Sequence, residues 1–469
     1  MRLLAPILLS LALGTGLQAD VQMPTLFGDH MVMQSGSPIH VWGLSDPNEE
    51  ISVTFRGQRV EFTASDIGMW ETYLDPAEPG GPYVLEVEGN NEVRIEDIHL
   101  GEVWIGSGQS NMVWPLERSD NSDEEIANAK HPGIRYFKVD QSTSDLPLED
   151  VGGQWRVVSP DTAAEFSGVA YFFARHIHQE LGVPVGVIQT AWGGTPAEAW
   201  TRLQAIKDDR ALSGLISSYD RAARLARSRR QDPRLHHKPS ALFNAMIAPL
   251  TPYPIRGVIW YQGENNGNRG QGILYRQLFR TLIQDWRAEW GIGDFPFLFV
   301  QLASYGRVSS AGTWPELREA QSMALGLANT GMAVTIDIGE SDDIHPRNKQ
   351  DVGLRLALAA RRVAYGEMHL EHSGPIYRQA TWEGSEVRLW FDHTAEGLEA
   401  RDGPLRGFEV AGANGGFYIG EARISGNTVV VSNPAVVRPI QVRYAWAPDP
   451  DGNLFNSAGL PASPFRTMR

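Results

Sequence analysis

Residues 101–112, GEVWIGSGQSNM, join a short apolar run to a loop of small polar residues that contains two serines, Ser107 and Ser110. A serine hydroxyl held at the end of a strand is the nucleophile of many acyl-transfer enzymes. One glycine short of G-x-G-x-x-G, the same loop also fits a dinucleotide site, and it fits a plain turn. The rest of the sequence is needed to choose among these three.

Three further segments carry groups that would assist a serine nucleophile, and each follows an apolar run. They are AWGGT at 191–195, QGENN at 262–266 and GESDDIHP at 339–346. Glycine N–H groups and amide side chains stabilise an oxyanion, a histidine accepts the serine proton, and an aspartate orients the histidine. The four segments together predict a serine acyl-transfer site.

Position relative to the predicted strands indicates which residues are the base and the nucleophile. His345 is the one histidine of twelve that follows the carboxyl end of a predicted parallel strand. Ser110 opens the turn after the first of these strands and is favoured over Ser107. Asp342 and Asp343 precede the histidine, and adjacent residues of an extended chain point in opposite directions, so at most one of them reaches it.

Other chemistries fit less well. A dinucleotide site needs a third glycine, where this chain has Asn111, and a carboxylate at the end of the next strand. Met112 replaces the last glycine of the G-x-S-x-G elbow, which argues against the lipase type of α/β hydrolase. No H-x-x-x-H pair occurs, and Asp342, Asp343 and His345 lack a second histidine for zinc. We therefore expect no metal and no cofactor.

The elements that must position these groups follow from the hydrophobic pattern. Short alternating runs between residues 20 and 100 predict an antiparallel β-sandwich, and a similar pattern returns over 371–469. Between them, residues 101–370 alternate apolar runs with helical segments, which predicts an α/β domain with a doubly wound parallel sheet. The predicted parallel strands lie at 103–106, 185–190, 257–261, 297–302 and 333–338. Ligands of such sheets bind at the carboxyl ends of the strands, where all four polar segments fall.

Composition restricts the partners and the compartment. The net charge of −15 argues against nucleic acid or an anionic membrane surface as a partner. The chain has no cysteine, hence no disulfide and no thiol nucleophile. Residues 1–19, with Arg2 and an apolar core at 3–13, predict a secretory signal peptide and a secreted or periplasmic protein. No other run is long enough for a membrane span.

The chain resembles the sialate O-acetylesterase family, a carbohydrate-esterase branch of the SGNH hydrolases. The resemblance covers essentially the whole mature chain. It rests on LFGDHMVMQ, VWG, GEVWIGSGQSNM, VIQTAWGGTPAEAW, LFNAMIAPL, GVIWYQGENN, LREAQ, DDIHPRNKQDVGLRLA and VRYAWAPDPDGNLFNSAGLPASPFR, in this order. It implies a flavodoxin-like SGNH domain between β domains and an enzyme that hydrolyses O-acetyl esters of sialic acids. Another acetylated sugar, such as acetylxylan, is the alternative substrate.

The resemblance also implies roles for individual residues. Ser110 is the nucleophile, His345 is the base, and the family's D-x-x-H spacing selects Asp342, with Asp343 or a backbone carbonyl as the alternative partner of the histidine. The expected oxyanion hole consists of the Ser110 N–H, Gly193, Gly194 and the Gln262 side chain. The expected substrate-binding residues are Gln109, Asn111, Trp192, Glu264 and Asn265. A rival interpretation is a non-catalytic glycan-binding protein, in which Trp104, Trp114 and Trp192 would stack on sugars.

Overall fold

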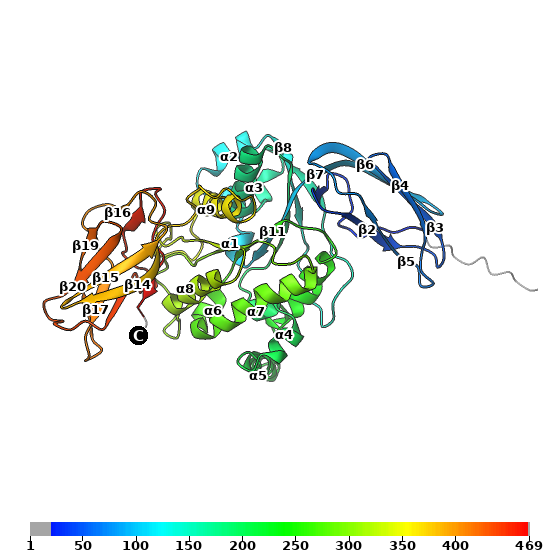
Figure 1. Cartoon of the computed structure of the whole chain (residues 1–469). Coiled ribbons are helices and arrows are strands. Elements are labelled where there is room, and N and C mark those ends of the chain that lie inside the picture. Colours follow the sequence, from blue (N-terminus) through cyan, green and yellow to red (C-terminus); the bar gives the residue numbers. More distant parts are fainter. Residues whose placement is uncertain (1–19, 468–469) are drawn as a thin grey trace, which may run out of the picture.

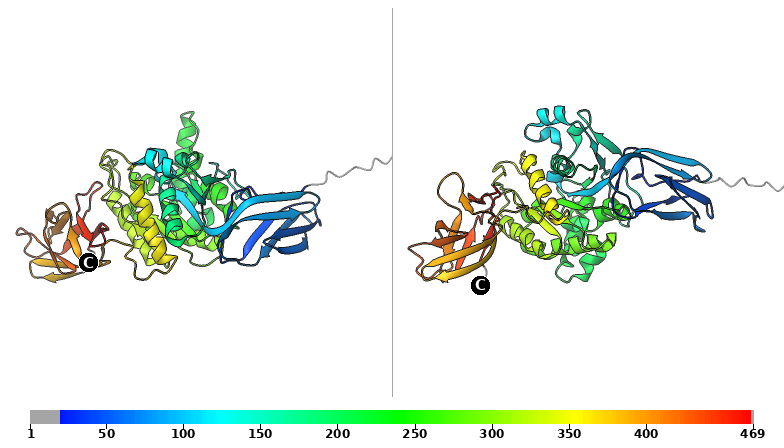
Figure 2. Two further views of the ribbon diagram at one scale, coloured as in Figure 1. Left: turned by 90° about the horizontal axis from the view of Figure 1, so that it is seen from above. Right: turned by 45° about the horizontal axis from the view of Figure 1, so that its top comes forward.

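The computed structural model describes residues 20–467, and the predicted signal peptide at 1–19 lies outside this range. The chain forms three parts in a row: an N-terminal β part, a central α/β part and a C-terminal β part (Figures 1 and 2). In the described range, no helix combines the length and the apolar character needed to cross a membrane.

The N-terminal part consists of short strands that pair in antiparallel fashion, as the alternating pattern predicts, except that β1 pairs with β7 in parallel. Strand β2 pairs with β5, and β3 pairs with β4 and β6. Their side chains alternate between the core and solvent, so Val41 and Val53 are fully buried. The strands are β1 (Val32–Gln34), β2 (Ile39–Leu44), β3 (Glu50–Phe55), β4 (Gln58–Thr63), β5 (Met69–Leu74) and β6 (Gly80–Glu88).

A single long strand, β7 (Glu92–Gly108), joins the first two parts. Its first half pairs with β6 in antiparallel fashion, and its second half lies in the central sheet. The predicted boundary between residues 100 and 101 therefore falls inside a continuous strand. Gly101 does not break the strand; a Cβ there would lie 2.1 Å from the Pro184 carbonyl oxygen, so glycine permits the close approach of the neighbouring chain.

The central sheet has the strand order β13-β12-β11-β7-β10-β8-β9, and all its strands are parallel except β9. The five strands that the sequence predicts correspond to β7, β10, β11, β12 and β13. Numbered along the chain, they have the spatial order 2-1-3-4-5, the flavodoxin-like order. The order reverses between β7 and β11, so the ligand crevice is expected where these two strands end. The other strands of this sheet are β8 (His131–Lys138), β9 (Trp155–Val158), β10 (Val185–Ala191), β11 (Gly257–Tyr261), β12 (Phe297–Val300) and β13 (Thr330–Ala333).

Two details of this sheet differ from the prediction. The last parallel strand is Thr330–Ala333, so residues 334–338 belong to the loop that leads to His345. Strands β8 and β9 were not predicted, because HPGIRYFK contains proline, glycine and charged residues and lacks the apolar run of a central strand. These two strands lie at one edge of the sheet, where fewer side chains must be apolar.

Helices cover both faces of the sheet (Figure 1). Helices α3 (Gly168–Leu181) and α9 (Lys349–Val363) pack against each other, and so do α7 (Gly272–Trp290) and α8 (Trp314–Met323). The predicted apolar stripe of α7 is core, since Leu278, Leu282 and Trp286 are buried. Four short helices lie in the connections: α1 (Ser110–Val113), α2 (Ser122–Asn128), α4 (Leu203–Asp208) and α6 (Glu264–Asn268). The longer helix α5 (Gly214–Ser228) lies between β10 and β11 in the chain. The predicted helix at 240–250 forms a π-helical turn (Phe243–Ile247) and a 3-10 turn (Ala248–Leu250).

The C-terminal part contains two four-stranded sheets and a two-stranded one. The first has the order β14-β15-β20-β19 and the second β18-β17-β21-β23, while β16 pairs with β22. The strands are β14 (Ile376–Glu383), β15 (Glu386–Asp392), β16 (Leu398–Ala400), β17 (Phe408–Ala411), β18 (Phe417–Ile419), β19 (Glu421–Ser425), β20 (Thr428–Ser432), β21 (Gln441–Tyr444), β22 (Leu454–Asn456) and β23 (Phe465–Arg466).

Candidate active site

The turn after β7 presents Ser110 at the crevice. Strand β7 ends at Gly108, and α1 begins at Ser110. Gly108 has φ +135°, and a Cβ there would lie 2.1 Å from the Tyr261 carbonyl oxygen of β11. Only glycine has both the conformational freedom and the small size for this position. Gly108 therefore allows a sharp turn beside a neighbouring strand, and Ser110 follows this turn at the carboxyl end of the sheet.

Ser110 and His345 meet at this end of the sheet. The Nε2 atom of His345 lies 2.9 Å from the Ser110 Oγ. The Trp114 ring, from the segment after α1, stacks on the imidazole with a centroid distance of 4.9 Å and an interplanar angle of 17°. A nucleophile and a base in hydrogen-bond contact, with the ring plane of the base held by packing, are the arrangement that general-base activation of a serine requires.

The acid limb of the pH profile of kcat/KM is expected to have its midpoint below 6.5, the usual pKa of histidine. Burial lowers the pKa of His345, the Asp343 carboxylate opposes this effect, and the Lys349 ammonium adds to it. The neutral imidazole is the base, so kcat/KM rises with pH through the lowered pKa. Measuring kcat/KM for an activated acetyl ester as a function of pH gives this midpoint. A midpoint above 6.5 would contradict the prediction.

Asp343, rather than Asp342, accompanies the base. The Oδ1 atom of Asp343 lies 3.6 Å from the Nδ1 of His345 and also accepts the His345 backbone N–H at 2.9 Å. Asp342 pairs with Arg307 at 2.9 Å, and its side chain is 83% exposed. The preference for Asp342 is therefore wrong. The D-x-x-H spacing selected the other aspartate because it takes no account of a turn. The Asp343 N–H donates to the Glu340 carbonyl at 3.2 Å, so the chain folds into a turn there.

Asp343→Asn is expected to lower kcat/KM by about 10- to 100-fold, because the imidazolium formed during catalysis loses its carboxylate. The same change shifts the acid limb further down, since Asp343 raises the pKa of His345. Asp342→Asn is the matched control and should alter kcat/KM by no more than about twofold, as expected for an exposed ion pair. Equal losses in the two variants would contradict this assignment.

The glycine pair after β10 lies against the nucleophile. A Cβ on Gly193 would lie 3.4 Å from the Cβ of Ser110, and Gly194 has φ +72°. The structure thus brings Gly193 close to Ser110, and Gly194 follows it in the chain. This arrangement suits an oxyanion hole built from backbone donors.

Gln262 does not belong to the oxyanion hole, contrary to the prediction. Its side chain is fully buried, and the Nε2 atom lies within hydrogen-bond distance of the Thr195 carbonyl (3.1 Å) and the Asn266 Oδ1 (2.8 Å). Its Oε1 accepts the Tyr275 hydroxyl at 2.8 Å. Gln262 therefore holds the loop after β10 against α6 and α7 from inside the protein.

The residues predicted to bind substrate fall into two groups. Gln109, Asn111 and Glu264 are buried and take part in internal hydrogen bonds, so their contact with substrate stays a prediction. Trp192 and Asn265 are half-buried and border the glycine pair. Asn265 donates from Nδ2 to the Gly194 carbonyl at 2.7 Å, and the Trp192 ring stacks on His236 at a centroid distance of 5.1 Å.

Asn111 and Glu264 belong to a buried hydrogen-bond network that the sequence did not predict. Asn111 donates from Nδ2 to the Glu264 Oε1 at 2.6 Å and to the Ile344 carbonyl at 3.0 Å. The Nζ of Lys349, at the start of α9, donates to the Asn111 Oδ1 at 2.6 Å. Asn111 therefore joins the loop of the nucleophile to the loop of the base and to α6.

The network places two ionisable groups in the interior. Burial lowers the pKa of Lys349 to about 7 and raises the pKa of Glu264, and each group opposes part of the shift of the other. Asn111 separates them and bonds to both. The only sequence signal for Lys349 is its place four residues after His345, at the start of an amphipathic helix, where a lysine is ordinarily solvated.

Comparison with known proteins shows the family of this chain. A family model described as carbohydrate esterase, sialic acid-specific acetylesterase, matches residues 100–362. A sialate O-acetylesterase of Homo sapiens is 34% identical over 374 residues, which cover 72% of this chain and 69% of that protein. The sialate O-acetylesterase of Mus musculus is 31% identical, with 93% of this chain and 92% of that protein covered. The chain belongs to this family of carbohydrate esterases.

The structural comparison extends to the flanking β parts of the esterase. The crystal structure of a carbohydrate acetylesterase from Xanthomonas citri has a TM-score of 0.88 and 41% identity, and the match covers 96% of this chain and 99% of that one. The protein is accordingly a carboxylic ester hydrolase that acts on acetylated carbohydrates. The predicted family and enzyme class are confirmed, and the rival interpretation of a non-catalytic glycan-binding protein is wrong. Trp104, one of its proposed sugar-stacking residues, is fully buried.

Proposed function

We propose that the enzyme removes O-acetyl groups from sialic acids through an acetyl-Ser110 intermediate, as an SGNH-type serine esterase. The observation that carries the mechanism is the 2.9 Å contact between the Ser110 Oγ and the His345 Nε2. Support for the substrate comes from the curated relatives, which are sialate O-acetylesterases and align over most of this chain.

In the first half of the reaction, the Ser110 Oγ attacks the acetyl carbonyl carbon while His345 Nε2 accepts the hydroxyl proton. The Ser110, Gly193 and Gly194 backbone N–H groups bind the oxyanion, and the C–O bond to the sugar breaks as His345 returns the proton to the leaving sugar oxygen. In the second half, His345 takes a proton from water, the hydroxide attacks the acetyl-enzyme, and acetate leaves while the Ser110 Oγ regains its proton.

An exposed cation near the crevice supports an anionic sugar. The Arg118 guanidinium lies 5.9 Å above the Trp114 ring, and Trp114 stacks on His345. A sialic acid carries a carboxylate that a guanidinium binds well, whereas a xylose unit is neutral. Arg118 is therefore the side chain that we assign to the substrate carboxylate.

The test compares acetate release from 9-O-acetyl sialic acid and from acetylxylan, with p-nitrophenyl acetate as a reference ester. The proposal expects a higher kcat/KM for the sialic acid. Arg118→Ala should raise KM about tenfold for that substrate alone, through loss of a charge-assisted hydrogen bond. Arg221→Ala, on the exposed face of α5, is the control. A preference for acetylxylan would refute the sialate assignment while leaving the serine mechanism in place.

We also propose that the enzyme is exported. The apolar segment at 3–13, with Arg2 before it and the small residue Ala19 directly before Asp20, supports cleavage before Asp20. Expression of the full chain in a bacterium, fractionation and mass determination of the product test this. A cytoplasmic protein that retains residues 1–19 would contradict export.

A further inference from the structure

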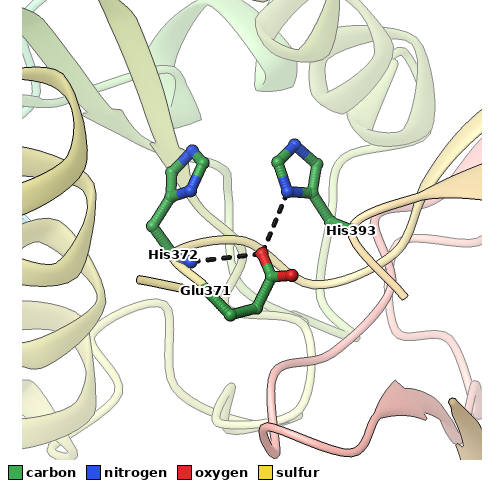
Figure 3. A group of neighbouring side chains, drawn as sticks. All are labelled: Glu371, His372 and His393. Carbon is green, nitrogen blue, oxygen red and sulfur yellow. Dashed lines mark hydrogen bonds and ion pairs between the residues drawn. The ribbon is translucent and has the colours of Figure 1, made fainter. Parts of the chain in front are cut away.

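Three side chains that commonly bind metal ions lie together at the junction between the α/β part and the C-terminal β part. They are Glu371, His372 and His393 (Figure 3), and their ligand atoms all lie within 4.8 Å of one another. Glu371 and His372 belong to the segment between α9 and β14, and His393 follows β15. None of them takes part in the active site described above.

The backbone around the cluster is held in place by one buried amide. The Nδ2 of Asn456, on β22, donates to the Ser373 carbonyl and to the His393 carbonyl, both at 2.9 Å. His393 has φ +60°, a left-handed conformation that costs a non-glycine residue free energy and persists only where the surroundings impose it. Asn456 is fully buried, so it fixes the two segments that carry the three side chains relative to each other.

The side chains themselves are oriented toward one another. The Oε1 of Glu371 accepts the His372 backbone N–H at 3.2 Å and lies 2.9 Å from the Nδ1 of His393 (Figure 3). The two imidazole rings are perpendicular, with centroids 4.9 Å apart. The exposed fractions of the His393 and Glu371 side chains are 34% and 24%, so an ion can enter from solvent and is still partly enclosed.

The chemistry of the donors selects the kind of ion. Two imidazole nitrogens and one carboxylate oxygen suit Zn²⁺ and related transition-metal ions, whereas Mg²⁺ and Ca²⁺ prefer oxygen ligands alone. A histidine binds a metal ion through a neutral imidazole nitrogen, and the Glu371 carboxylate adds a negative charge that favours a cation.

We propose that Glu371, His372 and His393 bind one zinc ion, with a fourth position left for water. The ion would connect the segment after α9 to the end of the β14–β15 hairpin and so fasten the C-terminal β part to the α/β part. It is a structural site, because it lies outside the crevice of Ser110 and His345. Metal loading should therefore change stability and leave ester hydrolysis unchanged.

The experiment uses the full mature chain without a histidine tag, freed of metal with EDTA and dialysed. Calorimetric titration with ZnCl₂ is expected to show one ion per chain, and tetrahedral Co²⁺ absorption should appear on titration with CoCl₂. His393→Ala and His372→Ala should each weaken zinc binding about tenfold or more, by the loss of one of three ligands. The apparent melting temperature should rise with zinc in the wild type and remain unchanged in these variants.

The control variant is His369→Ala, which alters an exposed histidine of the same segment and should bind zinc as the wild type does. Glu371→Gln keeps the shape of the side chain and serves if a histidine variant fails to fold. The proposal is overturned if the wild type binds no zinc, or if folded Glu371 or His393 variants bind it unchanged. It is equally overturned if His345→Ala abolishes binding, since the ion would then occupy the active site.

Discussion

Replacing Ser110 with alanine is expected to lower kcat/KM for an acetyl ester by about 1,000-fold or more, because no other group can form the acyl-enzyme. The Oγ atom is the one that His345 contacts at 2.9 Å, and alanine removes it while leaving the backbone N–H donors in place. Acetate release under saturating and subsaturating substrate measures the loss. The small residual activity should come from binding and oxyanion stabilisation alone.

Ser107 provides a matched control within the same loop. It is fully buried in β7, and its hydroxyl has no hydrogen-bond partner among the described residues. Ser107→Ala should therefore retain nearly full activity and a stability at least equal to the wild type, since an unsatisfied buried hydroxyl is removed. A fluorophosphonate should label the wild type and the Ser107 variant once each and leave the Ser110 variant unlabelled. Labelling of the Ser110 variant, or loss of activity on changing Ser107, would identify the wrong serine.

Replacing Lys349 with methionine is expected to lower the free energy of unfolding by about 2–4 kcal/mol, because a buried amide oxygen loses its donor and the buried Glu264 carboxyl loses the nearby positive charge. Methionine fills a similar volume, so the loss reports the polar contact and not a cavity. The Lys349 Nζ donates to the Asn111 Oδ1 at 2.6 Å, and both residues lie in the interior. Denaturant unfolding measures the change.

The same variant should lose about 10- to 100-fold in kcat, because small displacements of reacting groups are costly. Asn111 follows the nucleophile and donates to the Ile344 carbonyl, one residue before the base, so its position governs both. Lys207→Met, at an exposed position of α4, is the control. The double variant Lys349→Met/Glu264→Gln should recover part of the stability, since the buried charge is also gone. Wild-type stability and kcat in the single variant would show that the network has no positioning role.

Several elements were predictable because local patterns carry them. Helices α3, α7 and α9 coincide with apolar stripes of helical period, and the strands β10 and β11 coincide with continuous apolar runs. In a parallel sheet these strands end at the same edge, so the loops that follow them had to meet. For this reason the sequence sufficed to predict that Ser110, His345 and Gly193 lie together.

Other features depend on contacts between distant segments. The aspartate that accompanies His345 is decided by a turn at 340–343, where spacing alone favoured Asp342. The direction of the Gln262 side chain is decided by Tyr275, Thr195 and Asn266, which accept or donate inside the protein. An amide side chain looks the same in sequence whether it faces a crevice or the core.

The sequence by itself determined the family, the order of the main strands and helices of the α/β part, and the pairing of Ser110 with His345, because hydrophobic periodicity and motif spacing are properties of neighbouring residues. Tertiary structure alone decided which polar residues face the crevice and which form the buried network of Lys349, Asn111 and Glu264. It also decided that Glu371, His372 and His393 meet. The physical reason is that burial and hydrogen-bond partnership arise only when segments far apart in the chain are packed together.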